Sequence, residues 1–360
     1  MGGALMVTLF VGTSKGLFRV EGDSARSTWK LEDPVHSQWE VYRVWADTRT
    51  DPPTLWAGLS NPFFGAHLER SKDLGKTWEP APTPAFPDGS ERKLLQVWSF
   101  APARDGGVLA GVAEAAVFAS QDGSGWKLNE GLEGHPTRAG WQPGAGGLCA
   151  HTILPDSERP DRLYLGISAV GVFRSDDGGA TWAVKNEGVK SPIEEEAPRF
   201  PEIGRCVHSL VQDPTDPSRL YQQNHTGVYR SLDSGDHWER IEEGLPSGFG
   251  FPMVTHPTRP GTLFIAPLAA DANRTFPKGQ AAVYRSVDGG DHWQATTKGL
   301  PRDSYEGVLR SAMTVDHQPD PGVYFGTTGG DLYASTDLGE HWQTLPGRLP
   351  RVQSLFALET

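Results

Sequence analysis

Two copies of the tripeptide Cys-x-His are the most chemically distinctive feature of the sequence. Cys149-Ala150-His151 and Cys206-Val207-His208 contain the only two cysteines of the chain, and each opens a run typical of a β-strand. Residues two apart on a strand share a face, so each thiol is predicted to point the same way as its imidazole. Thiolate and imidazole are ligands that suit zinc and other borderline metals.

His225 adds a third imidazole to this group. It follows Leu220–Asn224, a run predicted to pair with the strand of His208, so both rings are expected at the same end of one sheet. One hypothesis is a divalent transition-metal site; its ligands would be Cys149, His151, Cys206, His208 and His225. A second is a metal-free site in which His151, His208 and His225 act as acids, bases or polar contacts. A third is ordinary packing of small buried thiols beside histidines that bond the backbone.

Both cysteines also raise the question of a disulfide. A bridge between Cys149 and Cys206 requires their two strands to come within bonding reach.

Arginines form a second set of candidates. Arg43, Arg205 and Arg310 each lie near the start of a predicted inner strand. A guanidinium pairs bidentately with a carboxylate, so these side chains are candidate substrate-binding groups. The alternative is that they form ordinary salt bridges at the surface. Further substrate-binding candidates are Gln223, Asn224, Trp141 and Tyr305.

Long connections supply candidate carboxylates. Glu195 lies in the connection 184–204 and Asp271 in the connection 266–280, and both connections mix aromatic and charged residues. Long insertions in a compact fold are often binding loops. Glu195 or Glu196, together with Asp271, are therefore candidates for the paired carboxylates of glycoside cleavage. The alternative for the glutamate run is a solvated loop.

The elements that position these residues are revealed by a repeat, Ser-x-Asp-x-Gly-x-x-Trp. Five full copies begin at Ser71, Ser175, Ser231, Ser286 and Ser335; a shortened copy spans 120–126 and a degenerate one ends at Trp29. Their tryptophans recur at spacings of 48 to 56 residues. The Ser and Asp side chains are predicted to bond backbone N–H groups in a tight turn. The Gly takes a positive φ, and the Trp packs against its own sheet.

Seven units of this length, each with several short strand signals, predict an all-β fold: one seven-bladed β-propeller domain over residues 1–360. The tail Val352–Glu359 reads as an inner strand with no unit after it, and the N-terminal unit lacks one. We therefore expect the C-terminal strand to complete the N-terminal blade and close the ring. Ligands of propellers favour the mouth of the central channel.

The net charge and the apolar runs of the sequence limit the classes of binding partner and the compartment. The net charge is −12, which argues against nucleic acid and anionic membranes as partners, because phosphate binding needs a basic surface. The N-terminal residues show no signal-peptide pattern and no apolar run reaches 18 residues, so a cytoplasmic protein is expected, without excluding secretion of a mature form. The expected partner is a small molecule or a glycan.

The boxes quoted above resemble those of the Asp-box, or BNR-repeat, propellers. That group includes sialidases, xyloglucan-active glycoside hydrolases, sortilin-type receptors and photosystem II assembly factors. The chain closely resembles stand-alone bacterial BNR-repeat proteins often labelled exo-alpha-sialidase or glycosyl hydrolase. The resemblance covers essentially the whole chain and implies that the box Asp residues are structural, on the face opposite the active site.

A sialidase would also need an arginine triad and a Tyr–Glu nucleophile pair. Arg43, Arg205 and Arg310 would supply the triad, and Tyr42 or Tyr305 with Glu40 or Glu306 the pair. The Arg-Ile-Pro element of sialidases is absent, so the sialidase signature is incomplete. The first hypothesis for function is a hydrolase acting on a small polar, carbohydrate-related substrate. The alternatives are a metal-dependent enzyme that uses the Cys-x-His pairs and a non-catalytic binding or assembly-factor propeller.

Overall fold

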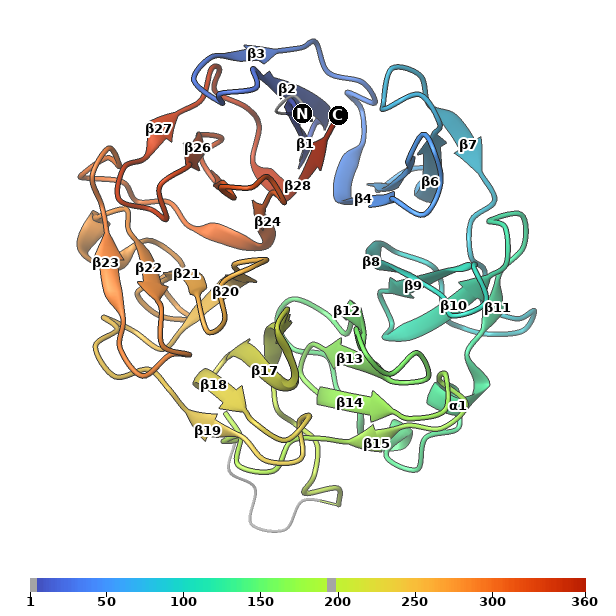
Figure 1. Ribbon diagram of the computed structural model, residues 1–360. Helices are drawn as coiled ribbons and strands as arrows, with labels where there is room; N and C mark the ends of the chain where they lie inside the picture. Colours follow the sequence, from blue (N-terminus) through green and yellow to red (C-terminus); the bar gives the residue numbers. More distant parts are fainter. Residues whose placement is uncertain (1–4, 193–198) are drawn as a thin grey trace. The chain divides into compact units, whose positions relative to one another are not determined.

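A computed structural model describes residues 5–192 and 199–360 of the chain. Within these residues the chain forms 28 β-strands, one short α-helix and two 3-10 turns. The strands form one eight-stranded and five four-stranded sheets, whose strands are paired mostly antiparallel (Figure 1). This nearly all-β arrangement confirms the predicted all-β class and is consistent with a β-propeller.

The eight-stranded sheet runs, in spatial order, β27 (Gln343–Thr344), β26 (Leu332–Ser335), β25 (Val323–Thr327), β24 (Val308–Val315), β28 (Val352–Glu359), β1 (Val7–Thr13), β2 (Gly16–Gly22) and β3 (Trp29–Leu31). Two four-stranded sheets consist of β4 (Glu40–Asp47), β5 (Thr54–Asn61), β6 (Gly65–Ser71) and β7 (Glu79–Ala81), and of β8 (Val97–Pro102), β9 (Val108–Val112), β10 (Ala116–Ser120) and β11 (Lys127–Leu128).

The other three sheets consist of β12 (Ala150–Pro155), β13 (Leu163–Ile167), β14 (Gly171–Ser175) and β15 (Ala183–Val184); of β16 (Val207–Asp213), β17 (Asp216–Asn224), β18 (Gly227–Ser231) and β19 (Glu239–Arg240); and of β20 (Gly250–Thr255), β21 (Leu263–Pro267), β22 (Val283–Ser286) and β23 (Gln294–Thr296). The helical segments are α1 (Glu130–Glu133), η1 (Arg138–Gly140) and η2 (Pro277–Gly279).

Contacts divide the chain into two compact units. Unit 1 comprises Met1–Val44, Asp213–Asp216 and Ile241–Thr360, and unit 2 comprises Trp45–Gln212 and Pro217–Arg240. Unit 1 contains the eight-stranded sheet and the sheet β20–β23. Unit 2 contains the sheets β8–β11 and β12–β15 and most of the remaining two.

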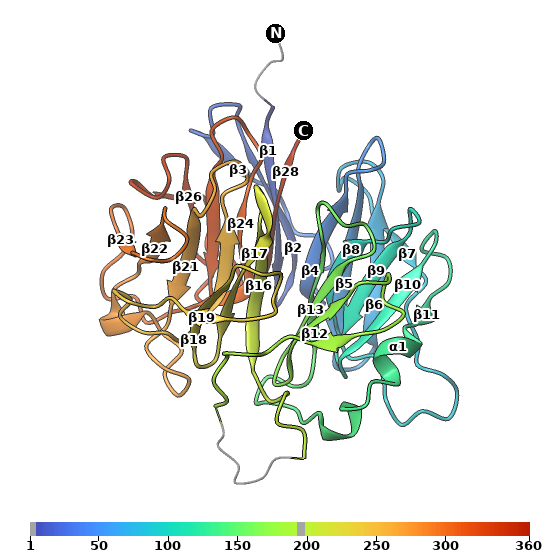
Figure 2. The ribbon, with the colours of Figure 1, turned by 60° about the horizontal axis from the view of Figure 1, so that its bottom comes forward.

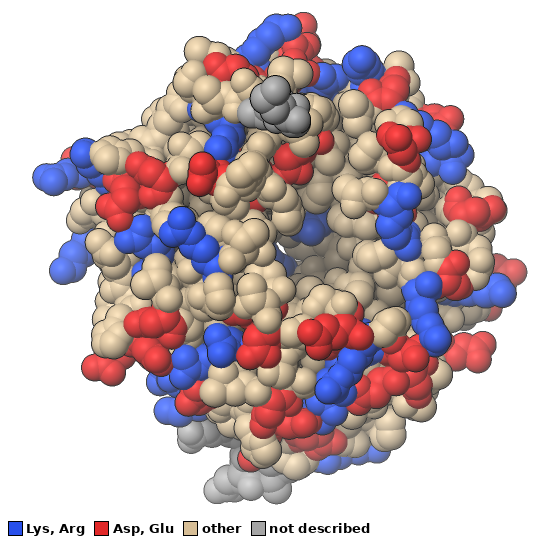
Figure 3. All heavy atoms as spheres, in the orientation of Figure 1, with Lys and Arg blue, Asp and Glu red and all other residues tan. Residues whose placement is uncertain are grey.

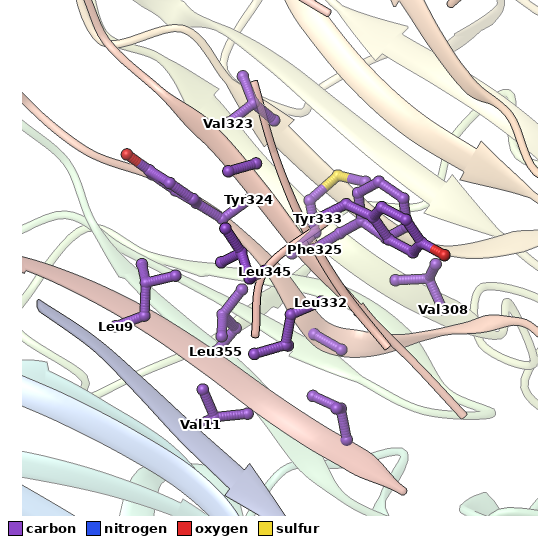
Figure 4. Close-up of a cluster of buried hydrophobic side chains, with 14 of the residues drawn as sticks. Leu9, Val11, Val308, Val323, Tyr324, Phe325, Leu332, Tyr333, Leu345 and Leu355 are labelled. Carbon is purple, nitrogen blue, oxygen red and sulfur yellow. The ribbon is translucent and has the colours of Figure 1, made fainter. Parts of the chain in front are cut away.

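The core of unit 1 forms where inner strands are buried on both faces. All seven residues of β1 are buried, including Leu9 and Val11. Leu9 and Val11 belong to the same hydrophobic cluster as Phe325 of β25 and Leu355 of β28 (Figure 4). The Phe325 ring stacks on Tyr333 with centroids 4.9 Å apart. Each such fully buried side chain contributes about 1.5–3 kcal/mol relative to exposure.

The predicted pairing of the C-terminal run with the N-terminal strand is present. β28 pairs antiparallel with β1, from Val7 opposite Glu359 to Thr13 opposite Val352, and the two strands lie side by side as red and dark blue arrows (Figure 1). β1 thus has a hydrogen-bonded neighbour on each side, so neither of its edges is open to pair with another chain.

The box turns have the predicted hydrogen bonds. In the copy at Ser71, the serine Oγ accepts the Gly75 amide at 2.9 Å, and Gly75 has φ 78°. Asp73 Oδ1 accepts the Thr77 amide at 2.9 Å, and its Oδ2 accepts the Thr77 hydroxyl at 2.6 Å. In three later copies a histidine replaces the threonine, and its Nδ1 lies 2.7 Å from the Asp Oδ2; these histidines are His237, His292 and His341. The box side chains therefore hold turns.

These bonds predict a loss of stability in acid. The Thr77 hydroxyl and amide lower the pKa of Asp73 to about 2, below its ordinary value of 3.8. The ionised carboxylate therefore stabilises the fold above pH about 4, and this contribution disappears as pH falls towards 2. The free-energy difference between wild type and D73N, measured by urea unfolding, should shrink from pH 5 to pH 2. A difference that grows over this range would contradict the assignment.

The surface carries charges of both signs. Figure 3 shows Asp and Glu side chains interspersed with Lys and Arg over the face that it views. No helix in the described part of the chain is both long and apolar enough to cross a bilayer.

Candidate functional site

Cys206, His208 and His225 come together in unit 2. Their side-chain donor atoms all lie within 4.8 Å of one another. The two imidazole rings meet edge to face, with centroids 5.7 Å apart and planes at 76°. His208 is buried, whereas Cys206 and His225 are half-buried, so two of the three residues are partly exposed to solvent. The predicted approach of the second tripeptide to His225 is therefore present.

The start of β16 is held by the residue before Cys206. The Arg205 amide donates to the Val170 carbonyl at 3.1 Å. Its guanidinium donates from Nε to the Val189 carbonyl at 2.9 Å and from Nη1 to the Ile203 carbonyl at 2.5 Å. Burial lowers the pKa of Arg205. Arg205 thus clamps loop carbonyls, a different role from the predicted grip on a substrate carboxylate.

His225 lies in the two-residue turn between β17 and β18, and β17 lies beside β16 in the same sheet (Figure 2). The His225 amide donates to the Cys206 carbonyl at 2.9 Å, which brings the turn against the start of β16. Asn224 Oδ1 accepts the Thr226 amide at 3.2 Å, and the Thr226 hydroxyl donates to the Lys190 carbonyl at 3.1 Å. The turn that carries His225 is therefore bonded on two sides.

Two predicted substrate-binding residues shape this turn. Asn224 and Gln223 are fully buried. Asn224 Nδ2 donates to Gln222 Oε1 at 3.0 Å, and Gln223 Nε2 donates to the Asn224 carbonyl at 3.2 Å. These amides position His225. Thr226 was not among the candidate residues, although its place two residues after Asn224 is a known turn signal.

His151 is placed apart from the group. Its Nε2 lies 3.0 Å from the Val207 carbonyl and its Nδ1 lies 2.9 Å from the Thr152 hydroxyl. A carbonyl only accepts, so Nε2 carries the proton and Nδ1 accepts from the hydroxyl. The structure thus corrects the expectation of three converging imidazoles. His151 supports the backbone between Cys206 and His208.

Cys149 also has other surroundings. It is buried, and its Sγ lies 3.1 Å from the Ser168 hydroxyl, which itself donates to the Gly147 carbonyl at 3.0 Å. Both cysteines lie in the described part of the chain, and no disulfide joins them. The side chains of the first tripeptide therefore contact other parts of the protein, whereas those of the second form a group with His225.

The remaining arginines lie in unit 1. Arg43 is on β4, and its Nε has no hydrogen-bond partner among the described residues. Burial lowers the pKa of Arg43 to about 10, so the guanidinium is still charged at neutral pH. Arg310 is half-buried on β24. Of the three arginines, Arg205 has its Nε and Nη1 bonded to carbonyls.

Trp141 belongs to the core of unit 2. It is 6% exposed, its Nε1 donates to Thr137 Oγ1 at 2.9 Å, and its ring lies 5.3 Å from that of Phe173. The Arg138 guanidinium covers it at 4.5 Å. This corrects its prediction as a substrate-binding residue. Tyr305, by contrast, is 71% exposed in unit 1.

The candidate carboxylates do not form a described pair. Glu195 and Glu196 lie outside the described residues. Asp271 is exposed and its Oδ1 pairs with Arg274 Nη2 at 2.5 Å. The group formed by Cys206, His208 and His225 includes no described carboxylate.

Comparisons with known proteins identify the fold. No protein-family model matches the chain. One curated relative, the tRNA 5-methylaminomethyl-2-thiouridine biosynthesis bifunctional protein MnmC of Acidovorax sp. (strain JS42), is 29% identical over 197 residues. That match covers 48% of this chain and 29% of the relative, so the chain spans less than a third of the curated protein it matches.

Solved β-propeller structures are similar over most of the chain. An ancestral GH74 enzyme has a TM-score of 0.57 at 17% identity and covers 84% of this chain and 38% of its own. YCF48 bound to a D1 peptide has a TM-score of 0.52 at 18% identity, with coverage of 81% and 77%. A "putative 6-phosphogluconolactonase" from Bacteroides uniformis has a TM-score of 0.60 at 11% identity, with coverage of 98% and 99%. At these identities the likeness concerns the fold.

Proposed function

We propose that the chain is a hydrolase acting on a small polar, carbohydrate-related molecule, with its reaction centre at Cys206, His208 and His225. The observation that carries the proposal is the convergence of the three donor atoms within 4.8 Å, in a group of which two residues are half-buried. Two imidazoles this close can activate water, either as a general base or by holding a metal ion. Solved structures of similar fold include hydrolases, which is compatible with this role.

The imidazole and thiol side chains of the group suit the hydrolysis of a lactone or an ester. Glycoside cleavage uses two carboxylates flanking the bond. The group at β16 and β17 offers imidazole and thiol, and no described carboxylate joins it. Attack of an activated water on the acyl carbon would break the C–O bond. The products would be a carboxylate and an alcohol; one proton of the water would pass to the leaving oxygen and the other would be released to solvent.

The test is a substrate screen with matched variants. We expect hydrolysis of aryl esters and sugar lactones and none of aryl glycosides. H225A and H208A should lower kcat/KM by at least about 100-fold, the smaller end of general acid–base contributions. C149S should stay within about twofold of wild type, because Cys149 lies beside Ser168 and apart from the group. No turnover on any ester or lactone, or full activity in H225A, would reject the proposal and favour a binding module.

We also propose that the sheets are seven blades of an Asp-box propeller. A single parallel bridge, between Ser311 and Ser354, connects β24 to β28. Division of the eight-stranded sheet at that bridge leaves only four-stranded sheets, and the five complete boxes share their turn hydrogen bonds. These two observations support the assignment.

A further inference from the structure

We infer that Cys206, His208 and His225 bind a zinc ion. The inference goes beyond the proposed hydrolysis, because an ion at this place binds whether or not the chain turns over a substrate. It starts from the donor set: one sulfur and two imidazole nitrogens. Zinc is held by such sets, whereas Ca²⁺ and Mg²⁺ take oxygen ligands.

Distances allow the three donors to reach one ion. Ligands about 2.0–2.3 Å from a tetrahedral zinc lie about 3.3–3.8 Å from one another. The three donor atoms lie within 4.8 Å of one another, which is about 1 Å more than this spacing. Small side-chain rotations that move the donor atoms by about 1 Å therefore bring them into one coordination sphere. Within the described residues the group has three donors, which leaves the fourth position for water or a substrate oxygen. This is the pattern of a catalytic zinc site.

The backbone around the ligands is fixed in advance. The Cys206 carbonyl accepts the His225 amide at 2.9 Å, so two of the ligands are tied together through the main chain. His151 Nε2 bonds the carbonyl of Val207, the residue between the other two ligands, at 3.0 Å. Such bonds just outside a metal centre orient the ligands.

The first tripeptide provides an internal comparison. Cys149 and His151 have the same sequence pattern, yet the thiol lies beside the Ser168 hydroxyl and the imidazole is bonded to Thr152 and Val207. In the first copy, the thiol and the imidazole therefore contact residues of the protein in a structural role. The second copy has a third donor, His225, at the corresponding end of its sheet, and two of its three members are partly exposed.

The experiment uses Co²⁺ as a spectroscopic probe for the zinc site in the full-length chain. The purified protein is stripped with a chelator, dialysed and titrated with Co²⁺. We expect one ion per chain, a near-ultraviolet thiolate-to-cobalt charge-transfer band, and loss of that band when Zn²⁺ is added. C206S should lose the band. H225A should bind at least about 100-fold more weakly, because loss of a direct ligand should cost more than the roughly 10–100-fold that loss of a residue behind the ligands costs.

The matched control is C149S, which removes the other thiol of the chain. It should keep both the band and the stoichiometry. Circular dichroism and urea unfolding verify that each variant is folded; if the buried H208A variant fails to fold, C206S and H225A carry the test. Absence of stoichiometric Co²⁺ binding by wild type, or a band retained in C206S, would overturn the inference. Stoichiometric Co²⁺ binding without hydrolysis would support the zinc site and reject the proposed hydrolase. Hydrolysis without Co²⁺ binding would support the hydrolase and reject the zinc site.

Discussion

Replacement of Arg26 by alanine is expected to lower the free energy of unfolding by about 3–5 kcal/mol, because it removes the cation from a buried carboxylate. Arg26 Nη1 donates to Asp316 Oδ2 at 2.8 Å, and the two side chains are 10% and 0% exposed. The same carboxylate accepts the Tyr324 hydroxyl at 2.6 Å. Burial, together with the neighbouring Asp316 charge, raises the pKa of Tyr324, so its hydroxyl stays protonated and donates.

The measurement is equilibrium urea unfolding of R26A beside R70A. Arg70 pairs with Glu79 at 2.7 Å, but these side chains are 25% and 55% exposed, so R70A should cost no more than about 1 kcal/mol. The double variant R26A/D316N should recover part of the loss, because the uncompensated charge is gone. Equal effects of R26A and R70A would show that the buried pair does not stabilise the fold in this way.

That network could not be predicted from the sequence. Arg26 precedes β3 and Asp316 follows β24, and their contact depends on how β28 brings the two ends of the chain together. The box turns were predictable for the opposite reason. Ser71, Asp73, Gly75 and Thr77 bond within four residues of one another, so local sequence determines the turn.

The candidate site divides in the same way. Alternation along a strand put Cys206 and His208 on one face, and the expected pairing of two neighbouring strands put His225 beside them; the structure has all three together. The equivalence of the two tripeptides did not extend to their surroundings. The partner of His151 is a carbonyl 56 residues away, and Trp141 is buried because its loop folds back on Phe173. These contacts depend on tertiary packing, which spacing alone does not encode.

Gly188→Ala is the second large effect, with an expected cost of about 2–5 kcal/mol in the free energy of unfolding. Gly188 has φ +88°, and an added Cβ would lie 2.1 Å from the Trp238 carbonyl oxygen. A left-handed conformation costs an L-residue about 1–2 kcal/mol, and forcing the backbone apart adds about 1–3 kcal/mol. Movement is resisted because the Trp238 amide donates to the Glu187 carbonyl at 2.9 Å.

Gly178→Ala measures the cost of a left-handed backbone conformation without the steric clash of an added Cβ. Gly178 has φ +72° but meets nothing within 4 Å, so its alanine variant should cost only about 1–2 kcal/mol in the same urea titration. The two variants should also differ at the candidate site. Val189, next to Gly188, accepts the Arg205 guanidinium that holds the start of β16 at Cys206. A displaced backbone at Gly188 should therefore weaken Co²⁺ binding, whereas G178A should leave it unchanged; equal affinities would mean that the Arg205 clamp does not position the ligands.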